Sequence, residues 1–228
     1  MIAVLISAKT EWNVVTAYYA ITQLESTPFG GKFSLKYDEE EIDFFLGGYG
    51  KIDAAASTQY IIDTYAPALI INFGTCGGFA GYTKAGDILV VDKTLVYDIV
   101  ERMFDAGQAI QAYATDIDVS WVQDIPDFPV IRSLLVSADR DIDPKDVERL
   151  HRMYHAIAGD WESGSIAHIC KRNSIPVFIV RGVSDVVSAY GGEAYQSPAI
   201  FITRTETIMK KLLHNLLPWI TMYRAHRT

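Results

Sequence analysis

Short, nearly continuous apolar runs alternate along this chain with longer segments whose apolar residues recur every three or four positions. Residues 2–6, 42–46 and 68–73 are runs of this kind, and they are typical of strands covered on both faces. Further strands are predicted at residues 87–91, 130–136 and 177–180. Helices are predicted at residues 10–24, 51–65, 144–156 and 162–173, and as an amphipathic C-terminal segment carrying Ile208, Leu212, Leu213, Leu216 and Leu217.

This alternation of strands and helices predicts an α/β fold. We expect a three-layer α/β/α sandwich around a mixed, mostly parallel sheet. No linker, repeat or low-complexity tract interrupts the chain, so residues 1–228 are expected to form one domain. Residues 97–129 and 186–200 do not fit simple strand–helix units, and each is either a functional excursion or a solvated surface loop.

Composition narrows the class of protein. The chain is half apolar with a formal net charge of −8, which argues against a nucleic-acid partner. Its two cysteines, Cys76 and Cys170, lack the spacing of a disulfide framework or zinc site. No apolar run reaches the length of a membrane helix, and no signal-peptide pattern is apparent. We therefore expect a cytoplasmic protein without a membrane partner.

The segment GGYGK at residues 47–51 resembles a phosphate-binding loop but lacks two of its required residues. Phe45 stands where that loop has its first glycine, and Ile52 stands where a hydroxyl would bind magnesium. A tight turn from a strand into a helix, with glycine permitting close backbone approach, is the favoured interpretation.

Two candidate metal motifs are also incomplete. The acidic segment 139–150 has Pro144 and Leu150 where a calcium loop requires glycine and glutamate. His151 and His155 share a helix face, but the glutamate of a zinc-hydrolase motif is missing. No metal site is predicted.

Acidic and glycine-rich positions follow several predicted strands: Glu11, 47–50, 75–78 and Asp185. Ligands of open α/β sheets bind beyond the carboxyl ends of the strands, so we expect these positions to form one site. Glu162, which begins the helix before the last of these strands, adds another carboxylate. The segment 73–79 is predicted to be a loop whose N–H groups form a cradle for an anion or hydroxyl.

In these and adjoining segments the chain resembles the methylthioadenosine/S-adenosylhomocysteine nucleosidases, within the nucleoside phosphorylase superfamily. The matching segments are VLISAKTEW (4–12), GGYGKIDAAAS (47–57), INFGTCGGF (71–79), AGDILVVDKTLVYD (85–98), DWESGSIAHIC (160–170) and IPVFIVRGVSD (175–185). The resemblance implies a nucleoside phosphorylase-like fold and cleavage of the N-glycosidic bond of a small purine nucleoside. It also implies no metal or organic cofactor, and a homodimer whose lid region, within residues 97–129, borders the partner subunit.

The resemblance assigns roles to individual residues. Asp185 matches the acid that protonates the purine at N7, Glu11 the carboxylate that activates water, and Glu162 the carboxylate that holds the ribose hydroxyls. General acid catalysis of this kind makes the base a neutral leaving group. The other predicted substrate contacts are Ala8, Tyr49, Thr75, Cys76, Gly77, Ile142, Trp161 and Ser184, with Ser184 as the hydroxyl partner of Asp185.

Hydrolysis is favoured over phosphorolysis. Phosphorylases hold phosphate with arginines, and this chain has none before Arg102. Glu11 in the first loop would repel phosphate and suits water. The alternatives are a phosphate-dependent phosphorylase and a nucleoside-binding protein with little turnover.

Three departures from the family bear on the substrate, which is otherwise expected to be 5′-methylthioadenosine or S-adenosylhomocysteine. Ala8 and Trp161 replace methionines, and Asp141 stands where the family packs an apolar residue on the purine. Either Asp141 points away and Trp161 covers the base, or the base differs from adenine. We favour the first, because the stretch from Asp141 to Pro144 resembles a helix entry with Asp143 as the better cap.

Overall fold

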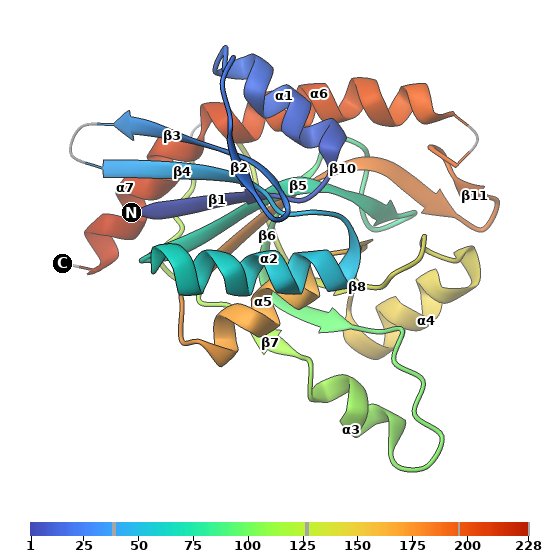
Figure 1. Cartoon of the computed structure of the whole chain (residues 1–228). Coiled ribbons are helices and arrows are strands. Elements are labelled where there is room, and N and C mark those ends of the chain that lie inside the picture. Colours follow the sequence, from blue (N-terminus) through green and yellow to red (C-terminus); the bar gives the residue numbers. More distant parts are fainter. Residues whose placement is uncertain (38–39, 126–127, 196, 228) are drawn as a thin grey trace.

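Helices cover both faces of one mixed sheet in the computed structural model, which describes residues 1–37, 40–125, 128–195 and 197–227 (Figure 1). The strands are β1 (Ile2–Ile6), β2 (Glu25–Thr27), β3 (Gly30–Tyr37), β4 (Glu40–Leu46), β5 (Leu69–Phe79), β6 (Ile88–Val96), β7 (Thr115–Asp116), β8 (Ile131–Ser137), β9 (Ala158–Asp160), β10 (Val177–Ser188) and β11 (Gly191–Gly192). The helices are α1 (Lys9–Tyr18), α2 (Gly50–Tyr65), α3 (Ala106–Gln111), α4 (Pro144–Tyr154), α5 (Ser163–Arg172), α6 (Pro198–His214) and α7 (Leu216–Arg227).

Parallel pairing joins β4, β1, β5 and β10 in the middle of the sheet, so that their carboxyl ends share one edge. Leu5 pairs with Phe45 on one side and with Asn72 on the other. β10 also pairs with β6, and β6, β8, β9 and β5 continue the pairing, which closes these strands into a ring. The mixed α/β fold predicted from the sequence is confirmed.

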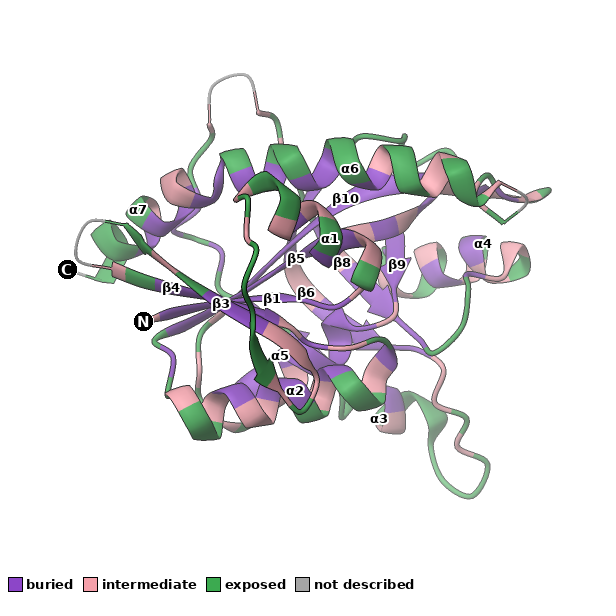
Figure 2. Ribbon diagram, turned by 45° about the horizontal axis from the view of Figure 1, so that its top comes forward, coloured by how far each residue is buried: buried purple, intermediate pink, exposed green. Residues whose placement is uncertain are grey.

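The sheet is buried because helices pack on each side of it. α1 lies beside α6 on one face, and α2 lies beside α5 on the other (Figure 1). The central strands β1, β5 and β10 are almost wholly buried, whereas β2 at the edge of the sheet and the outward sides of the helices are exposed (Figure 2). Apolar runs such as that of β1 are therefore explained by burial on both faces.

The predicted loop at 73–79 is wrong. β5 runs straight through it to Phe79, because β10 and β9 pair with its glycines on both sides. β10 likewise continues to Ser188, so Asp185 lies within the strand instead of after it. A register shift between Val183 and Asp185 marks an irregularity at this point, of the kind that re-aims a side chain beside a site.

Other boundaries also differ from the prediction. The first helix ends at Tyr18, since Ala20 adopts a left-handed conformation (φ 53°). The antiparallel pairing of β2 and β3 was not predicted. The C-terminal segment is two helices, and Pro218 lies in the first turn of α7, where proline is tolerated. The 97–129 segment contains α3 and β7, and its residues 126–127 lie outside the described residues.

Two negative findings concern the described residues only. Within 1–37, 40–125, 128–195 and 197–227, no helix is both long and apolar enough to cross a membrane. Cys76 and Cys170 are both buried and free.

Candidate active site

A cavity of about 330 Å³ opens at the edge of the sheet where the parallel strands end. It is lined by Ala8, Glu11, Tyr49, Thr75, Cys76, Gly77, Arg140, Asp141, Ile142, Gly159, Asp160, Trp161, Glu162, Ser184, Asp185, Ala194, Tyr195, Pro198 and Phe201. All of the site residues predicted from the sequence are in this lining. The convergence of strand-end segments on one cavity is therefore observed.

Glu11 is buried in the first turn of α1 and is held by β5. Its Oε1 accepts hydrogen bonds from the Thr75 N–H at 2.6 Å and from the Thr75 hydroxyl at 2.8 Å. Its Oε2 accepts a longer bond, of 3.4 Å, from the N–H of Ala8. Burial raises the pKa of Glu11, and the charge of Arg181 opposes this rise. The carboxyl group is thus fixed in direction and shielded from water on its protein side.

Arg181 lies behind the cavity wall, where it is only 2% exposed. Its Nε donates to Asp160 at 2.9 Å, and its Nη2 donates to the side chain of Asn72. A Cβ atom at Gly74 would stand 2.8 Å from Arg181 Nη1 and 3.0 Å from Glu11 Oε1. Glycine at this position therefore permits the close approach of guanidinium and carboxylate.

Glu162 stands at the N-cap position of α5, where its side chain makes no capping hydrogen bond and reaches across to the start of α2 instead. Its Oε1 accepts the N–H of Gly50 at 3.0 Å. Burial, and then the charge of Asp160, raises the pKa of Glu162 to about 8. The turn that presents this N–H requires glycine, since Gly48 and Gly50 both have positive φ (85° and 78°). This confirms the predicted strand-to-helix turn.

Asp185 is held by its neighbour on β10. The Ser184 hydroxyl lies 2.8 Å from Asp185 Oδ1 and 3.2 Å from the carbonyl oxygen of Cys76. Burial raises the pKa of Asp185, whereas the hydrogen bonds from Ser184 and from the backbone of Ala194 lower it. The net upward direction favours a protonated carboxyl group, as general acid catalysis requires.

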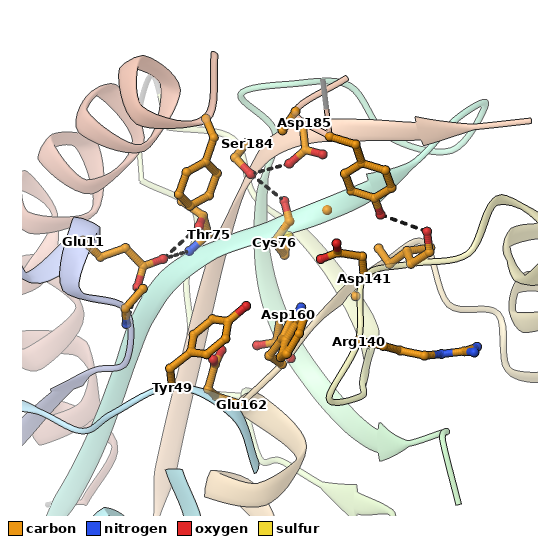
Figure 3. A pocket seen from close by; sticks show the side chains of 18 of the residues that line it. Glu11, Tyr49, Thr75, Cys76, Arg140, Asp141, Asp160, Glu162, Ser184 and Asp185 are labelled. Carbon is orange, nitrogen blue, oxygen red and sulfur yellow. Dashed lines mark hydrogen bonds between the residues drawn. The ribbon is translucent and has the colours of Figure 1, made fainter. Parts of the chain in front are cut away.

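The lining divides into two sides (Figure 3). We call Glu11, Tyr49, Thr75 and Glu162 the Glu11 side, and Asp141 and Asp185 the Asp185 side. Tyr195 and Ile142, which are joined by a hydrogen bond, belong to the Asp185 side because Tyr195 lies near both of its carboxylates. The ring of Trp161 stacks on that of Tyr49, with centroids 4.8 Å apart.

The expectation that Asp141 points away from the site is wrong. Asp141 lines the cavity, and its carboxyl group is on the Asp185 side (Figure 3). Helix α4 is capped by Asp143, whose side chain accepts the N–H of Lys145 at 2.9 Å. Because Asp143 fills the capping position, Asp141 is free to face the cavity.

Several lining residues were missed in the sequence. Ala194, Tyr195, Pro198 and Phe201 come from the irregular 186–200 segment and the first turn of α6. Tyr195 crosses to the segment before α4, where its hydroxyl donates to the Ile142 carbonyl at 2.8 Å. The Gly/Ser-rich character of this segment was a signal, but it did not indicate which side chains turn inward.

Among its described residues, the lining carries five carboxylate side chains and a single guanidinium: Glu11, Asp141, Asp160, Glu162, Asp185 and Arg140. Arg140 is paired with Asp146 and lies over the ring of Tyr97. In the described part of the chain, no group of three or more His, Cys, Asp or Glu side chains is arranged to hold a metal ion. The site therefore offers acid–base groups to an uncharged or cationic ligand.

The sequence model of the Phosphorylase superfamily matches residues 10–218. A 5′-methylthioadenosine/S-adenosylhomocysteine nucleosidase of Buchnera aphidicola (strain Tuc7) is 30% identical over 164 residues, which are 66% of this chain and 69% of the relative. The nucleosidase of Bacillus subtilis is 28% identical over 192 residues, 77% of this chain and 82% of the relative.

Solved structures share the fold at lower identity. The nucleosidase of Helicobacter pylori, in complex with a substituted pyrrolidinol, superposes with a TM-score of 0.78 at 18% identity, covering 94% of this chain and 97% of that one. A nucleosidase of Campylobacter jejuni gives a TM-score of 0.76 at 19% identity, covering 93% and 96%. The solved structures show the shared fold, and the sequence matches show that the chain belongs to the 5′-methylthioadenosine/S-adenosylhomocysteine nucleosidase family of the phosphorylase superfamily.

Proposed function

We propose that this protein hydrolyses the N-glycosidic bond of 5′-methylthioadenosine and S-adenosylhomocysteine and releases adenine. Relatives from Buchnera aphidicola and Bacillus subtilis carry the name of this activity. The observation that carries the proposal is one cavity in which Glu11 and Glu162 face Asp185 across the space for a ligand (Figure 3).

In the proposed reaction, Asp185 transfers its proton to N7 of the purine as the bond between C1′ and N9 breaks. The electron pair of that bond moves into the base, which leaves as neutral adenine. The raised pKa of Asp185 supports this role, because the group must hold a proton near neutral pH.

Water completes the reaction on the opposite side of the cavity. The water oxygen bonds to C1′ and its proton passes to Glu11, whose carboxyl group is oriented by Thr75. We assign Glu162 to the ribose hydroxyls, beside the ring of Tyr49. A proton returns from Glu11 to solvent and another is taken up by Asp185, which restores the starting state.

Charge in the cavity supports water over phosphate as the nucleophile. A phosphate dianion needs free guanidinium or ammonium groups. Within the described lining, Arg140 is the one basic side chain and already pairs with Asp146. Arg181 is engaged by Asp160 and Asn72 behind the wall. We therefore do not favour a phosphorylase.

Product analysis tests this function. The purified protein is incubated with 5′-methylthioadenosine in phosphate-free buffer and in phosphate buffer, and the base and sugar products are identified. We expect adenine and free 5-methylthioribose at the same rate in both. Strict dependence on phosphate, with a sugar 1-phosphate as product, would contradict hydrolysis.

We also infer that residues 1–228 act as one domain, and that the protein is a cytoplasmic homodimer. The buried, free thiols of Cys76 and Cys170 are compatible with a reducing compartment. An exposed apolar cluster supports the dimer: Val100, Met103 and Phe104 are 75%, 83% and 79% exposed. Such a cluster is typical of an interaction surface.

Sedimentation tests the dimer. Wild-type protein is expected to sediment as a dimer, and the double variant Met103→Glu/Phe104→Glu as a monomer. Tyr190→Glu is the matched control, since Tyr190 is 99% exposed in a different loop. A wild-type protein that is monomeric at all concentrations would contradict the proposal.

A further inference from the structure

Among the described residues, Asp141 differs from the other carboxylates of the cavity in having no hydrogen-bond or ion-pair partner. Its side chain is exposed, and among the described residues it makes no hydrogen bond or ion pair. Glu11 accepts hydrogen bonds from Thr75, and Glu162 accepts one from Gly50. A free carboxylate in a ligand cavity keeps its full capacity to accept hydrogen bonds from the ligand.

Asp160 and Asp185 are likewise satisfied from within the protein. Asp160 accepts from Ser137 at 2.6 Å, and it also accepts from Ser163 and Arg181. Asp185 accepts from Ser184. Among the described carboxylates of the cavity, Asp141 is therefore the one without a hydrogen-bond donor from the protein. Because its side chain is exposed, burial does not require it to have one.

The place of Asp141 in the cavity indicates which part of a nucleoside it meets. Burial, and then the charges of Asp141 and Asp185, raise the pKa of Tyr195, so the tyrosine hydroxyl lies within electrostatic reach of the two carboxyl groups. That hydroxyl donates to the carbonyl of Ile142. Asp141 thus lies on the same side as the proposed acid, across from Glu11 and Glu162 (Figure 3).

The backbone carbonyl of Ile142, next to Asp141, already accepts one hydrogen bond from the protein. Tyr195 occupies one acceptor direction of the Ile142 carbonyl at 2.8 Å. A base edge that reaches this end of the cavity meets one partly occupied carbonyl and one free carboxylate. The carboxylate is the stronger acceptor, because hydrogen bonds to a charged group are stronger than neutral ones.

Purine geometry then defines the contact. With N7 at Asp185, the substituent on C6 projects from the neighbouring position of the same edge. An amino group at C6 donates hydrogen bonds, as adenine does from N6. An oxo group at C6 presents lone pairs, which a carboxylate repels.

We propose that Asp141 is a specificity-determining residue that selects 6-aminopurine over 6-oxopurine nucleosides by accepting a hydrogen bond from the C6 amino group. This inference rests on the proposed function, since it requires the base to be protonated by Asp185. It gives the acidic side chain at this position a role that an apolar residue could not perform.

The test compares kcat/KM for 5′-methylthioadenosine and 5′-methylthioinosine in wild type and in Asp141→Asn. Asparagine keeps the size of the side chain but presents an N–H as readily as an oxygen. The preference for the amino substrate is expected to fall by about 10- to 100-fold, the scale of one hydrogen bond to a charged group. Much of the change should be a gain on 5′-methylthioinosine.

Asp143→Asn is the matched control, because Asp143 caps α4 and does not line the cavity. Its preference is expected to equal that of wild type. Wild-type protein that releases adenine, with a preference unchanged in Asp141→Asn, would overturn this inference alone. Wild-type protein that releases base from neither nucleoside would overturn the proposed function and the inference with it.

Discussion

On the Glu11 side of the cavity each carboxylate is buried and hydrogen-bonded by the protein, whereas on the Asp185 side Asp141 is exposed and unpartnered among the described residues. Hydrogen bonds from Thr75 hold the carboxyl group of Glu11 in one orientation. A hydrogen bond from Gly50 does the same for Glu162. Rigid groups of this kind suit chemistry, because they need no reorganisation during the reaction. A free carboxylate suits discrimination between ligands.

Asp185 belongs to the same side as Asp141, but it resembles the carboxylates of the Glu11 side in being buried and hydrogen-bonded, in its case by Ser184. Catalysis and the selection of the substrate are therefore expected to depend on different residues. Variants on the Glu11 side and at Asp185 should change turnover or stability, whereas a variant of Asp141 should change preference.

The largest effect is expected for Asp185→Asn. An amide retains the hydrogen bond with Ser184 but has no proton to transfer, so kcat should fall by at least about 100-fold, the usual scale of general acid catalysis. Steady-state kinetics with 5′-methylthioadenosine measures this fall, with melting temperature as the control for folding. Near-normal turnover in a folded variant would remove Asp185 from the mechanism.

Glu162 should make stability depend on pH. Its pKa rises from 4.5 to about 8 on folding, so between these values the folded protein binds more protons than the unfolded chain. The stability that this group contributes is therefore present at low pH and is lost as pH rises through about 8. The loss is on the order of 2–4 kcal/mol.

Glu162→Gln keeps an oxygen to accept the Gly50 N–H but does not titrate. Its unfolding free energy should vary less between pH 5 and 8.5 than that of wild type, and denaturant unfolding at several pH values measures the difference. Parallel pH profiles for the two proteins would show that Glu162 is not the buried titrating group.

A smaller effect is expected for Trp161→Ala. The indole stacks on Tyr49 and lines the cavity, and one lost aromatic contact with a base or sugar is worth about 1–3 kcal/mol. KM should rise about tenfold with kcat nearly unchanged. Tyr18→Ala is the control, because Tyr18 is 40% exposed and lies outside this lining. An unchanged KM would exclude Trp161 as a contact of the substrate.

The positions of the site residues could be predicted where the local sequence determines the helix or strand that carries them. Glu11 and Glu162 lie at the starts of helices that the sequence pattern locates well, whereas Asp185 lies within β10, whose end the apolar run did not locate. The glycine-rich part of β5 was not recognisable as a strand, because glycine is disfavoured in strands and here depends on pairing with β9 and β10.

Side-chain direction was harder to predict. Asp141 and Asp143 both precede Pro144, and local sequence alone permits either to approach the cap. Asp143 caps the helix, and the Ile142 carbonyl between them accepts a hydrogen bond from Tyr195, which is distant in sequence. Contacts of this kind arise only once β10 and α4 are packed together.

The central claim is that one cavity keeps catalysis and selection on different residues, and the most direct test measures both substrates in Glu11→Gln and Asp141→Asn. We predict that Glu11→Gln lowers kcat/KM for 5′-methylthioadenosine and 5′-methylthioinosine by the same factor, about 100-fold, so that their ratio stays that of wild type. Asp141→Asn should instead change the ratio. A ratio that changes as much in Glu11→Gln as in Asp141→Asn would contradict the account.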